Sequence, residues 1–208
     1  MDTTILPIKG EKTYLVVYKA LLDGEVISFP TDTVYGIGCA LFNPDAIERI
    51  YKIKERSTVK AIPVLIGNFE QLKAVSSCIS LNAHYLTKAF WPGALTVIVN
   101  KSRQIPKTLS SGSSVGVRMP NHNWLRNLIT QVGPLAVTSA NLSGKKDSQN
   151  AQEVLHQLKN RIKYIVDGGS CDKGIPSTVV DCTQENIQIL RQGAILVDQI
   201  NAVIQAQI

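Results

Sequence analysis

The chain has 208 residues, of which 44% are hydrophobic and 18% charged, a balance that excludes a disordered chain and allows a sizeable core. Lysine and arginine number 22 against 16 acidic residues, giving a net charge of +6. This mild excess favours anionic partners such as nucleotides, RNA or phosphate, although no run of like charges predicts nucleic-acid binding by itself.

Helices and strands are predicted to alternate irregularly, as in one α/β domain over residues 1–208 with neither a repeat nor a linker. An amphipathic helix over residues 11–23 precedes a strand at 25–28. Asn43-Pro44-Asp45 then combines a capping side chain, a proline and an acid, as helix starts do. Further strands are expected at residues 61–66, 95–99, 115–119, 135–137, 164–166, 178–182 and 187–190. Further helices are expected after Asn68, over 81–89, 121–132 and 151–158, and from about 198.

Several broad classes are excluded by what the sequence lacks. Four scattered cysteines without a C-x-x-C pair argue against a zinc site or a disulfide framework. No apolar run is long enough to span a bilayer, and no targeting leader precedes the first helix. We therefore expect a soluble cytoplasmic protein. No Walker A loop, complete dinucleotide fingerprint or nucleophile elbow occurs, so any catalysis must rest on positioning and charge neutralisation.

The stretch Phe29–Gly38 places two threonine hydroxyls, one carboxylate and two glycines directly after a predicted strand. Strand ends are frequent ligand sites in α/β proteins, and glycine lets the backbone approach a neighbour or a ligand closely. A polar turn in a core hairpin explains the stretch equally well. Asp32 is not assigned as a general base, because a hydrogen bond that caps its own turn accounts for it.

Two short motifs carry polar groups at a spacing of two residues. Lys54 and Arg56 point the same way if their loop is extended, and could then grip one polyanion together. A solvated helix end accounts for them as well. Ser139 and Asn141 follow a strand and share a side, so they could present a donor and an acceptor to a ligand, or form an ordinary turn.

Cations and hydroxyls also stand at three other strand ends. Arg118 and Arg191 each end an apolar run and precede Pro120 and Gly193, as an anion clamp or a structural ion pair would. Ser177 follows Pro176 at the start of a predicted strand. Residues 95–99 form a continuous apolar run apart from one threonine, which predicts a strand buried on both faces.

Taken together, the motifs strongly resemble those of the YrdC family, and within it the threonylcarbamoyl-AMP synthases, in the same order from about residue 11 to 193. The matching pieces are Pro30–Gly36, Lys54-x-Arg56 with Lys60, Trp91-Pro92-Gly93, Val117–Pro120, Ser139-x-Asn141 with Ser143-Gly144, Pro176–Thr178 and Leu190-Arg191-x-Gly193.

The resemblance implies a twisted mixed open sheet flanked by helices, with a basic concave cavity. It implies that L-threonine, bicarbonate or CO2 and ATP give threonylcarbamoyl-AMP and pyrophosphate, for transfer by a partner enzyme to a tRNA adenosine beside the anticodon. Mg²⁺ would accompany ATP, held mainly by its phosphates. The family signature maps catalytic roles onto Lys54, Arg56, Ser139 and Asn141. Threonine contacts map onto Thr33, Arg118, Thr138, Ser139 and Ser177, and ATP contacts onto Arg56, Lys60, Ser114, Asn141, Ser148 and Arg191.

Two departures and two alternatives accompany this hypothesis. Some longer members carry a histidine near threonine where Val64 or Leu65 stands here, and the chain ends without the extra C-terminal domain of the long form. The loops over residues 101–114 and 167–174 are candidate lids. The alternatives are a double-stranded RNA or tRNA-binding module of the same fold, and a relative that has lost synthase activity; the intact Ser-x-Asn pair argues against the latter.

Overall fold

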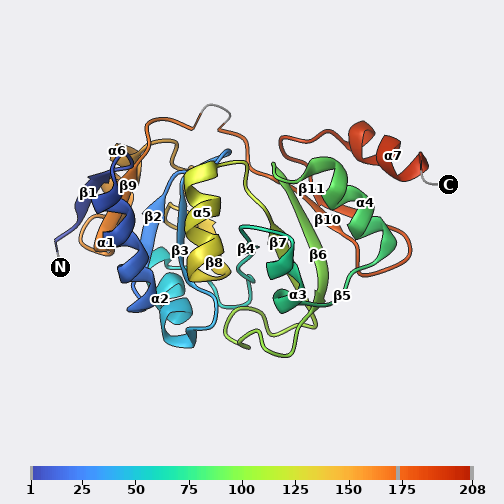
Figure 1. Ribbon diagram of the computed structural model, residues 1–208, viewed down its shortest axis with the longest axis horizontal. Helices are drawn as coiled ribbons and strands as arrows, with labels where there is room; N and C mark the ends of the chain where they lie inside the picture. The colour runs from blue at the N-terminus through green and yellow to red at the C-terminus, as the bar shows by residue number, and fades with distance from the viewer. Residues whose placement is uncertain (1, 172–173, 207–208) are drawn as a thin grey trace.

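The computed structural model describes residues 2–171 and 174–206. Its strands form one sheet in the order β1-β9-β2-β3-β8-β4-β7-β6-β10-β11, with β5 paired to β6. The two chain ends lie at opposite ends of this row of strands (Figure 1). The strands are β1 (Thr4–Pro7), β2 (Ile27–Phe29), β3 (Gly36–Ala40), β4 (Val64–Leu65), β5 (Ser76–Cys78), β6 (Leu95–Lys101), β7 (Ser114–Arg118), β8 (Leu135–Ser139), β9 (Tyr164–Asp167), β10 (Thr178–Asp181) and β11 (Gln188–Arg191).

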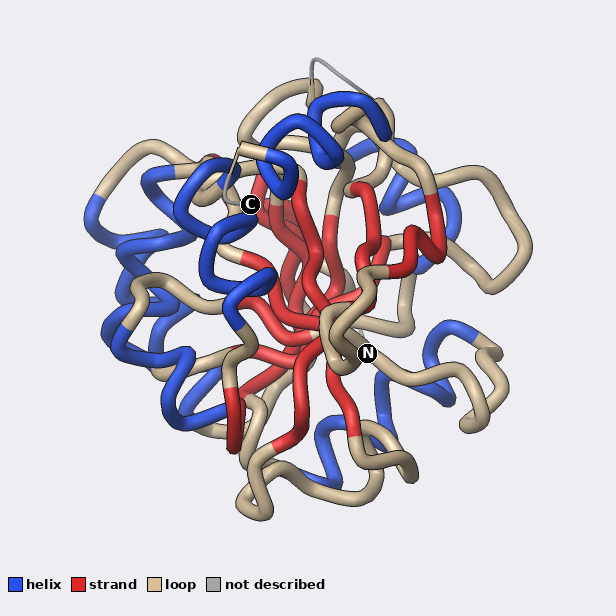
Figure 2. Tube along the Cα trace, turned by 90° about the vertical axis from the view of Figure 1, so that its right-hand side faces the viewer, coloured by secondary structure: helices blue, strands red, loops and turns tan. Residues whose placement is uncertain are grey.

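Helices lie around the sheet, which Figure 2 shows in the middle of the molecule. They are α1 (Glu11–Leu22), α2 (Pro44–Lys54), α3 (Glu70–Val75), α4 (Leu81–Phe90), α5 (Asn123–Val132), α6 (Ala151–Leu158) and α7 (Val197–Gln205). Parallel and antiparallel pairs both occur, for example β6 with β10 and β6 with β7. The mixed sheet flanked by helices confirms the predicted α/β fold class.

The two faces of the sheet carry separate hydrophobic clusters. On one face, α1 and α5 pack against side chains such as Phe29, Leu135 and Val166. On the other face, α2, α4 and α6 pack over Ile37, Val97 and other strand residues. Because α1 and α5 contact each other and cover only part of their face, the strands toward β10 are left open to a ligand on that side.

Strand pairing aligns one row of residues across this uncovered area. Gly116 of β7 pairs with Ile98 of β6, Thr96 pairs with Val179 of β10, and Val179 pairs with Arg191 of β11. Residues two apart in a strand share a face, so Arg118 lies on the same side as Gly116. The sheet therefore presents Arg118, Thr96 and Arg191 on this face, with Gly116, Ile98 and Val179 beside them, while the alternate residues fill the core.

Most predicted elements are present, with differences at their ends. Asn43 caps α2 through its side chain, as predicted, and Asn68 accepts a hydrogen bond from the Gln71 amide before α3. The structure adds β1, β3 and β5, which the sequence pattern did not predict. The expectation that residues 95–99 are buried on both faces holds for all of them except Ile98, which is partly exposed where it lines a cleft.

Candidate functional site

A cleft of about 390 Å³ lies over the uncovered part of the sheet. Its floor is the row of paired strand residues together with neighbouring strand residues, and its walls are the β2–β3 turn, the β8 exit and the segments around β10 and β11. The predicted site residues that line it are Thr33, Arg56, Arg118, Thr138, Ser139, Ser177 and Arg191. Residues from six separate stretches of sequence therefore meet in one cavity.

Arg118 is held on three sides at the end of β7. Its Nε donates to the Gly93 carbonyl at 3.0 Å, Nη1 donates to the Thr33 hydroxyl at 2.9 Å, and Nη2 donates to Asp32 Oδ1 at 2.5 Å. Burial lowers the pKa of Arg118, and the adjacent Asp32 carboxylate opposes that shift. The arginine forms the ion pair that the sequence left as one alternative, and it also lines the cleft.

The β2–β3 turn organises this end of the cleft, and it corrects one interpretation. The Thr31 hydroxyl accepts from the Thr33 amide at 3.1 Å and donates to the Val34 carbonyl at 2.7 Å. The local turn is thus closed by Thr31, while Asp32 reaches across to Arg118. A capping hydrogen bond within its own turn, which the sequence left open for Asp32 as an alternative to a general base, is therefore not its role.

Ser177 and Arg191 form the opposite wall. The Ser177 and Thr96 hydroxyls lie 2.8 Å apart, and Arg191 Nη2 donates to the Ser177 carbonyl at 2.9 Å. Burial lowers the pKa of the Arg191 guanidinium, and Asp147 opposes this effect. Nε and Nη2 of Arg191 donate to Ser177, so N–H donors of the guanidinium remain for an anion.

Lys54 does not face the cleft. It is 1% exposed, and its Nζ donates to the carbonyls of Ser139 and Asn141, the latter at 2.5 Å, and to Asn141 Oδ1 at 3.2 Å. Burial, reinforced by the nearby Arg56 charge, lowers the pKa of Lys54 to about 8. The ammonium is therefore a buried anchor of the loop after β8.

Lys54 and Arg56 do not point the same way, so they cannot share the grip on one polyanion that the sequence left open, and the cause is the residue between them. Glu55 ends α2 in the left-handed conformation, with φ of 52°, so the chain turns sharply there instead of running extended. Arg56 consequently points into the cleft, while its Nε and Nη2 donate to the carbonyls of Lys60 and Ala61. Lys60 itself is exposed, and its side chain does not line the cleft.

Ser139 and Asn141 share a side, as predicted, but they face each other. The Ser139 hydroxyl donates to Asn141 Oδ1 at 2.6 Å, and the Asn141 amide group donates to the carbonyls of Leu142 and Lys145. Lys54 fixes the orientation of that amide by donating to Oδ1. Ser139 lines the cleft while Asn141 lies behind it, so Ser139 can only accept from a ligand.

Two serines that the resemblance assigned to ATP do not line the cleft. Ser148 is fully buried, and its hydroxyl donates to the Ala140 carbonyl at 2.8 Å. Ser114 begins β7 opposite Asn100, at the far end of the strand from Arg118. In this structure the Ser148 hydroxyl supports the β8 exit loop from within.

The cleft also contains residues that sequence reasoning missed. Asp147 lines the cleft. It follows Lys145 and Lys146 and precedes the buried Ser148, and no local sequence pattern marked it as a site residue. Tyr35 lines the cleft too, and its hydroxyl donates to the Gly169 carbonyl at 2.7 Å, tying the β2–β3 turn to the loop after β9. That loop was a candidate lid; residues 172–173 of it lie outside the described residues.

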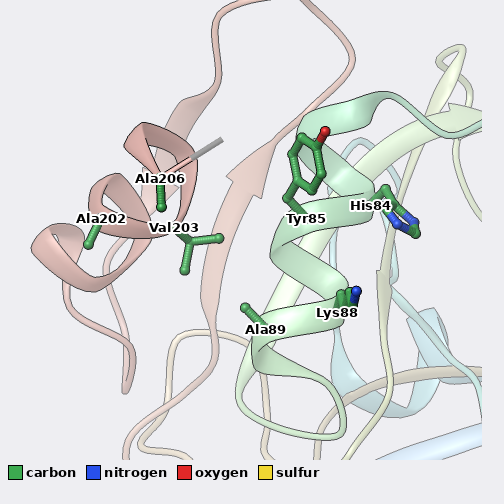
Figure 3. Close-up of a pocket in the computed structure, with 7 residues that line it drawn as sticks. All are labelled: His84, Tyr85, Lys88, Ala89, Ala202, Val203 and Ala206. Carbon is green, nitrogen blue, oxygen red and sulfur yellow. The ribbon is translucent and has the colours of Figure 1, made fainter. Parts of the chain in front are cut away.

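A second depression lies between α4 and α7 (Figure 3). It is lined by His84, Tyr85, Lys88, Ala89, Ala202, Val203 and Ala206, with Val203 directed toward α4. Apolar and small side chains dominate it, and it lacks the converging hydroxyl and guanidinium groups of the first cleft. We therefore take the cleft over the sheet as the candidate functional site.

Within residues 2–171 and 174–206, no helix is long and apolar enough to cross a membrane. No three histidine, cysteine, aspartate or glutamate side chains there gather as metal ligands.

Comparison with known proteins gives matches over most of the chain. The family model Sua5_yciO_yrdC, described as "Telomere recombination", matches residues 19–193. Threonylcarbamoyl-AMP synthase of Bacillus subtilis is 41% identical over 187 residues, which cover 88% of this chain and 54% of that protein. Threonylcarbamoyl-AMP synthase of Vibrio vulnificus is 35% identical over 181 residues, covering 85% of this chain and 96% of its own length.

The fold also matches that of a solved structure. The crystal structure of Pyrococcus abyssi Sua5 complexed with L-threonine superimposes with a TM-score of 0.93 at 34% identity, covering 97% of this chain and 61% of the other. The present chain thus spans little more than half the length of two of these relatives and nearly all of the third.

Proposed function

Because the chain belongs to the family of Sua5, YciO and YrdC, we propose that it is a threonylcarbamoyl-AMP synthase. It would combine L-threonine, bicarbonate or CO2 and ATP, and release threonylcarbamoyl-AMP and pyrophosphate. The product would serve threonylcarbamoyl modification of a cytoplasmic tRNA by a downstream transferase. The observation that carries the proposal is one cleft lined by Arg118, which is held by Thr33 and Asp32, and by two further arginines, Arg56 and Arg191.

The surroundings of Arg118 suit an amino acid. Two N–H donors of Arg118 remain after its three hydrogen bonds, one on each terminal nitrogen, which matches the two oxygens of a carboxylate. Ser139 offers only an acceptor, which suits an N–H of the amino group. Thr33 and Thr138 add polar contacts around the same space, and the Ser177 hydroxyl lines the cleft from the opposite wall, beside Arg191.

The two further arginines suit a polyphosphate. Arg56 and Arg191 both line the cleft and keep guanidinium donors free, and guanidinium groups bind phosphate oxygens in a bidentate manner. Mg²⁺ would enter with ATP, held through the phosphates, and would neutralise part of their charge. Lys60, Ser114 and Ser148 would contribute at most through the loops that they belong to, since their side chains lie outside the cavity lining.

The reaction follows from this arrangement in two steps. The neutral amino group of threonine attacks the carbon of CO2; a C–N bond forms as one C=O π bond opens onto oxygen, and the nitrogen passes a proton to water, which gives a carbamate. A carbamate oxygen then attacks the α-phosphorus of ATP, and the bond to pyrophosphate breaks. Negative charge moves toward the leaving pyrophosphate, where the guanidinium groups stabilise it. No covalent enzyme intermediate is required, so alignment of the two substrates supplies most of the rate.

Pyrophosphate release from ATP, measured with Mg²⁺ and bicarbonate, tests this proposal. We expect release that depends on L-threonine and falls about tenfold or more in Ser139→Ala, which loses the acceptor for the amino group. Ser77→Ala, an exposed serine on β5, is the matched control and should leave the rate unchanged. Absence of threonine-dependent release by folded protein would contradict the proposal, and binding of duplex RNA with steep salt dependence would then favour the RNA-binding alternative.

A further inference from the structure

The Asp32–Arg118 ion pair stands apart from the other ion pairs of the described residues. Its side chains are 8% and 15% exposed for arginine and aspartate, whereas the pairs Arg49–Glu25, Lys73–Glu70 and Arg161–Glu55 are much more open to solvent. A buried pair contributes little net stability, because desolvation offsets the attraction. Its location at a cleft wall therefore calls for a functional reason.

The geometry shows what the pair does to Arg118. The Gly93 carbonyl, the Thr33 hydroxyl and the Asp32 carboxylate approach three different N–H groups, so the guanidinium plane is fixed in both rotation and translation. Asp32 supplies the only charged contact of the three. Without it, the arginine would keep two neutral acceptors and carry an uncompensated buried charge.

The charges of the cleft suggest a second consequence. The charges of Arg118 and Asp32 cancel each other. Among the residues that line the cavity, Asp147 is the one carboxylate available to Arg56 and Arg191. Arg191 is close enough to Arg118 to disfavour its charge. With Asp32 neutral, Arg118 and Arg191 would together form a dicationic patch that fits a polyphosphate.

We propose that Asp32 is a positioning and specificity-determining residue: it fixes Arg118 for an amino-acid carboxylate and neutralises that end of the cleft, so that polyphosphate does not occupy it. The inference rests on the proposed function for the identity of the amino acid. A zwitterionic amino acid has no net charge and fits a neutral pair, while a triphosphate is directed to the Arg56 and Arg191 end.

Calorimetric titration of L-threonine tests the positioning role. Asp32→Ala removes the acceptor and should raise the Kd of threonine about tenfold or more, the cost of one hydrogen bond to a charged group. Glu25→Gln, which removes the carboxylate of an exposed pair away from the cleft, should leave the Kd unchanged. A wild-type protein that binds no threonine would contradict the proposed function. Wild-type binding with an unchanged Kd in Asp32→Ala would overturn this inference alone.

The same titration with inorganic tripolyphosphate present tests the neutralising role. Asp32→Asn keeps an oxygen acceptor for Arg118 but loses the charge, so threonine binding without tripolyphosphate should weaken only a few-fold. Added tripolyphosphate should then weaken it about tenfold further in Asp32→Asn and leave the wild type unaffected. Equal behaviour of the two proteins would overturn this role. Should Asp32→Ala fail to show a native melting transition, Asp32→Asn carries the test of both roles.

Discussion

Lys54 is a buried cation whose three hydrogen-bond acceptors are all uncharged oxygen atoms. Its position explains how a residue outside the cleft can control the residues that line it. By holding the carbonyls of Ser139 and Asn141 and the Asn141 side chain, it fixes the loop that presents the Ser139 hydroxyl. This arrangement costs folding free energy, because burial disfavours the charged form of Lys54.

That cost makes stability depend on pH in a definite direction. The pKa of Lys54 is about 8 in the folded protein and near the ordinary value of 10.5 when unfolded. Between these values the unfolded chain binds more protons, so this residue makes stability rise with pH. The Lys54→Met variant lacks the effect. The difference in unfolding free energy, wild type minus variant, should therefore increase by about 3 kcal/mol from pH 7.5 to 10.5 in urea titrations.

Comparison with the variant is essential, because other groups act in the opposite direction. Burial raises the pKa of Cys39, Cys182 and Tyr35 to about 12, and these groups make the folded protein less stable as pH rises. They are present in both proteins and cancel in the difference. A difference between wild type and Lys54→Met that does not change with pH would contradict the buried-anchor interpretation.

The residue types predicted which side chains of this site are polar, but they did not predict where Lys54 points or which residue Asp32 contacts. The types at Thr33, Arg118, Ser139, Ser177 and Arg191 indicated polar contacts, and all five line the cleft. The direction of Lys54 could not be read from spacing, because it depends on the left-handed backbone of Glu55. The partner of Asp32 could not be read either, since Arg118 lies 86 positions away along the chain.

In the hairpin of β2 and β3, the sequence likewise predicted one feature and the structure revealed another. The sequence predicted an organising polar turn, and the structure adds that Gly36–Ala40 is a strand packed closely on β8. A Cβ at Gly38 would lie 2.8 Å from the Ala136 carbonyl oxygen and 2.7 Å from Val137 Cγ2. Glycine is required there by a neighbouring strand, and a ligand is not needed to explain it.

Gly38→Ala should consequently destabilise the protein by about 1–3 kcal/mol, because the added methyl group overpacks the contact between β3 and β8. Since Gly36 pairs with Ser139 in the same ladder, threonine-dependent activity should fall as well. Urea denaturation and the pyrophosphate assay measure the two effects. Gly112→Ala is the matched control, because a Cβ there meets only Ser110 Oγ at 3.8 Å. Equal stability of the two variants would contradict the tight packing.

Across the whole molecule, the cleft joins strands from both ends of the sequence. Arg118 and the β2–β3 turn form one end, while Arg191 comes from the last strand, β11. Each end should therefore affect one substrate selectively. The separation is a property of the sheet order, in which β7, β6, β10 and β11 follow one another.

Arg191→Met should raise the KM for ATP about tenfold or more while the KM for threonine changes little, because a phosphate contact is lost at one end only. Steady-state pyrophosphate release with each substrate varied in turn measures this split. Arg161→Met, which removes an arginine paired with Glu55 outside the cleft, is the control. Parallel increases in both KM values would show that Arg191 supports the cleft as a whole.

By itself, the sequence determined the elements with a strong periodic or capping signal and the fold class. Helices such as Ala151–Leu158 and the Asn43 cap depend on neighbours within a few residues, so local pattern suffices for them. The ordered motifs also determined the family. Only the tertiary structure decided which polar groups face the cleft and which lie behind it. Contacts such as Asp32–Arg118 and Lys54–Ser139 depend on strand order and on one backbone turn, and these emerge only when the whole chain packs.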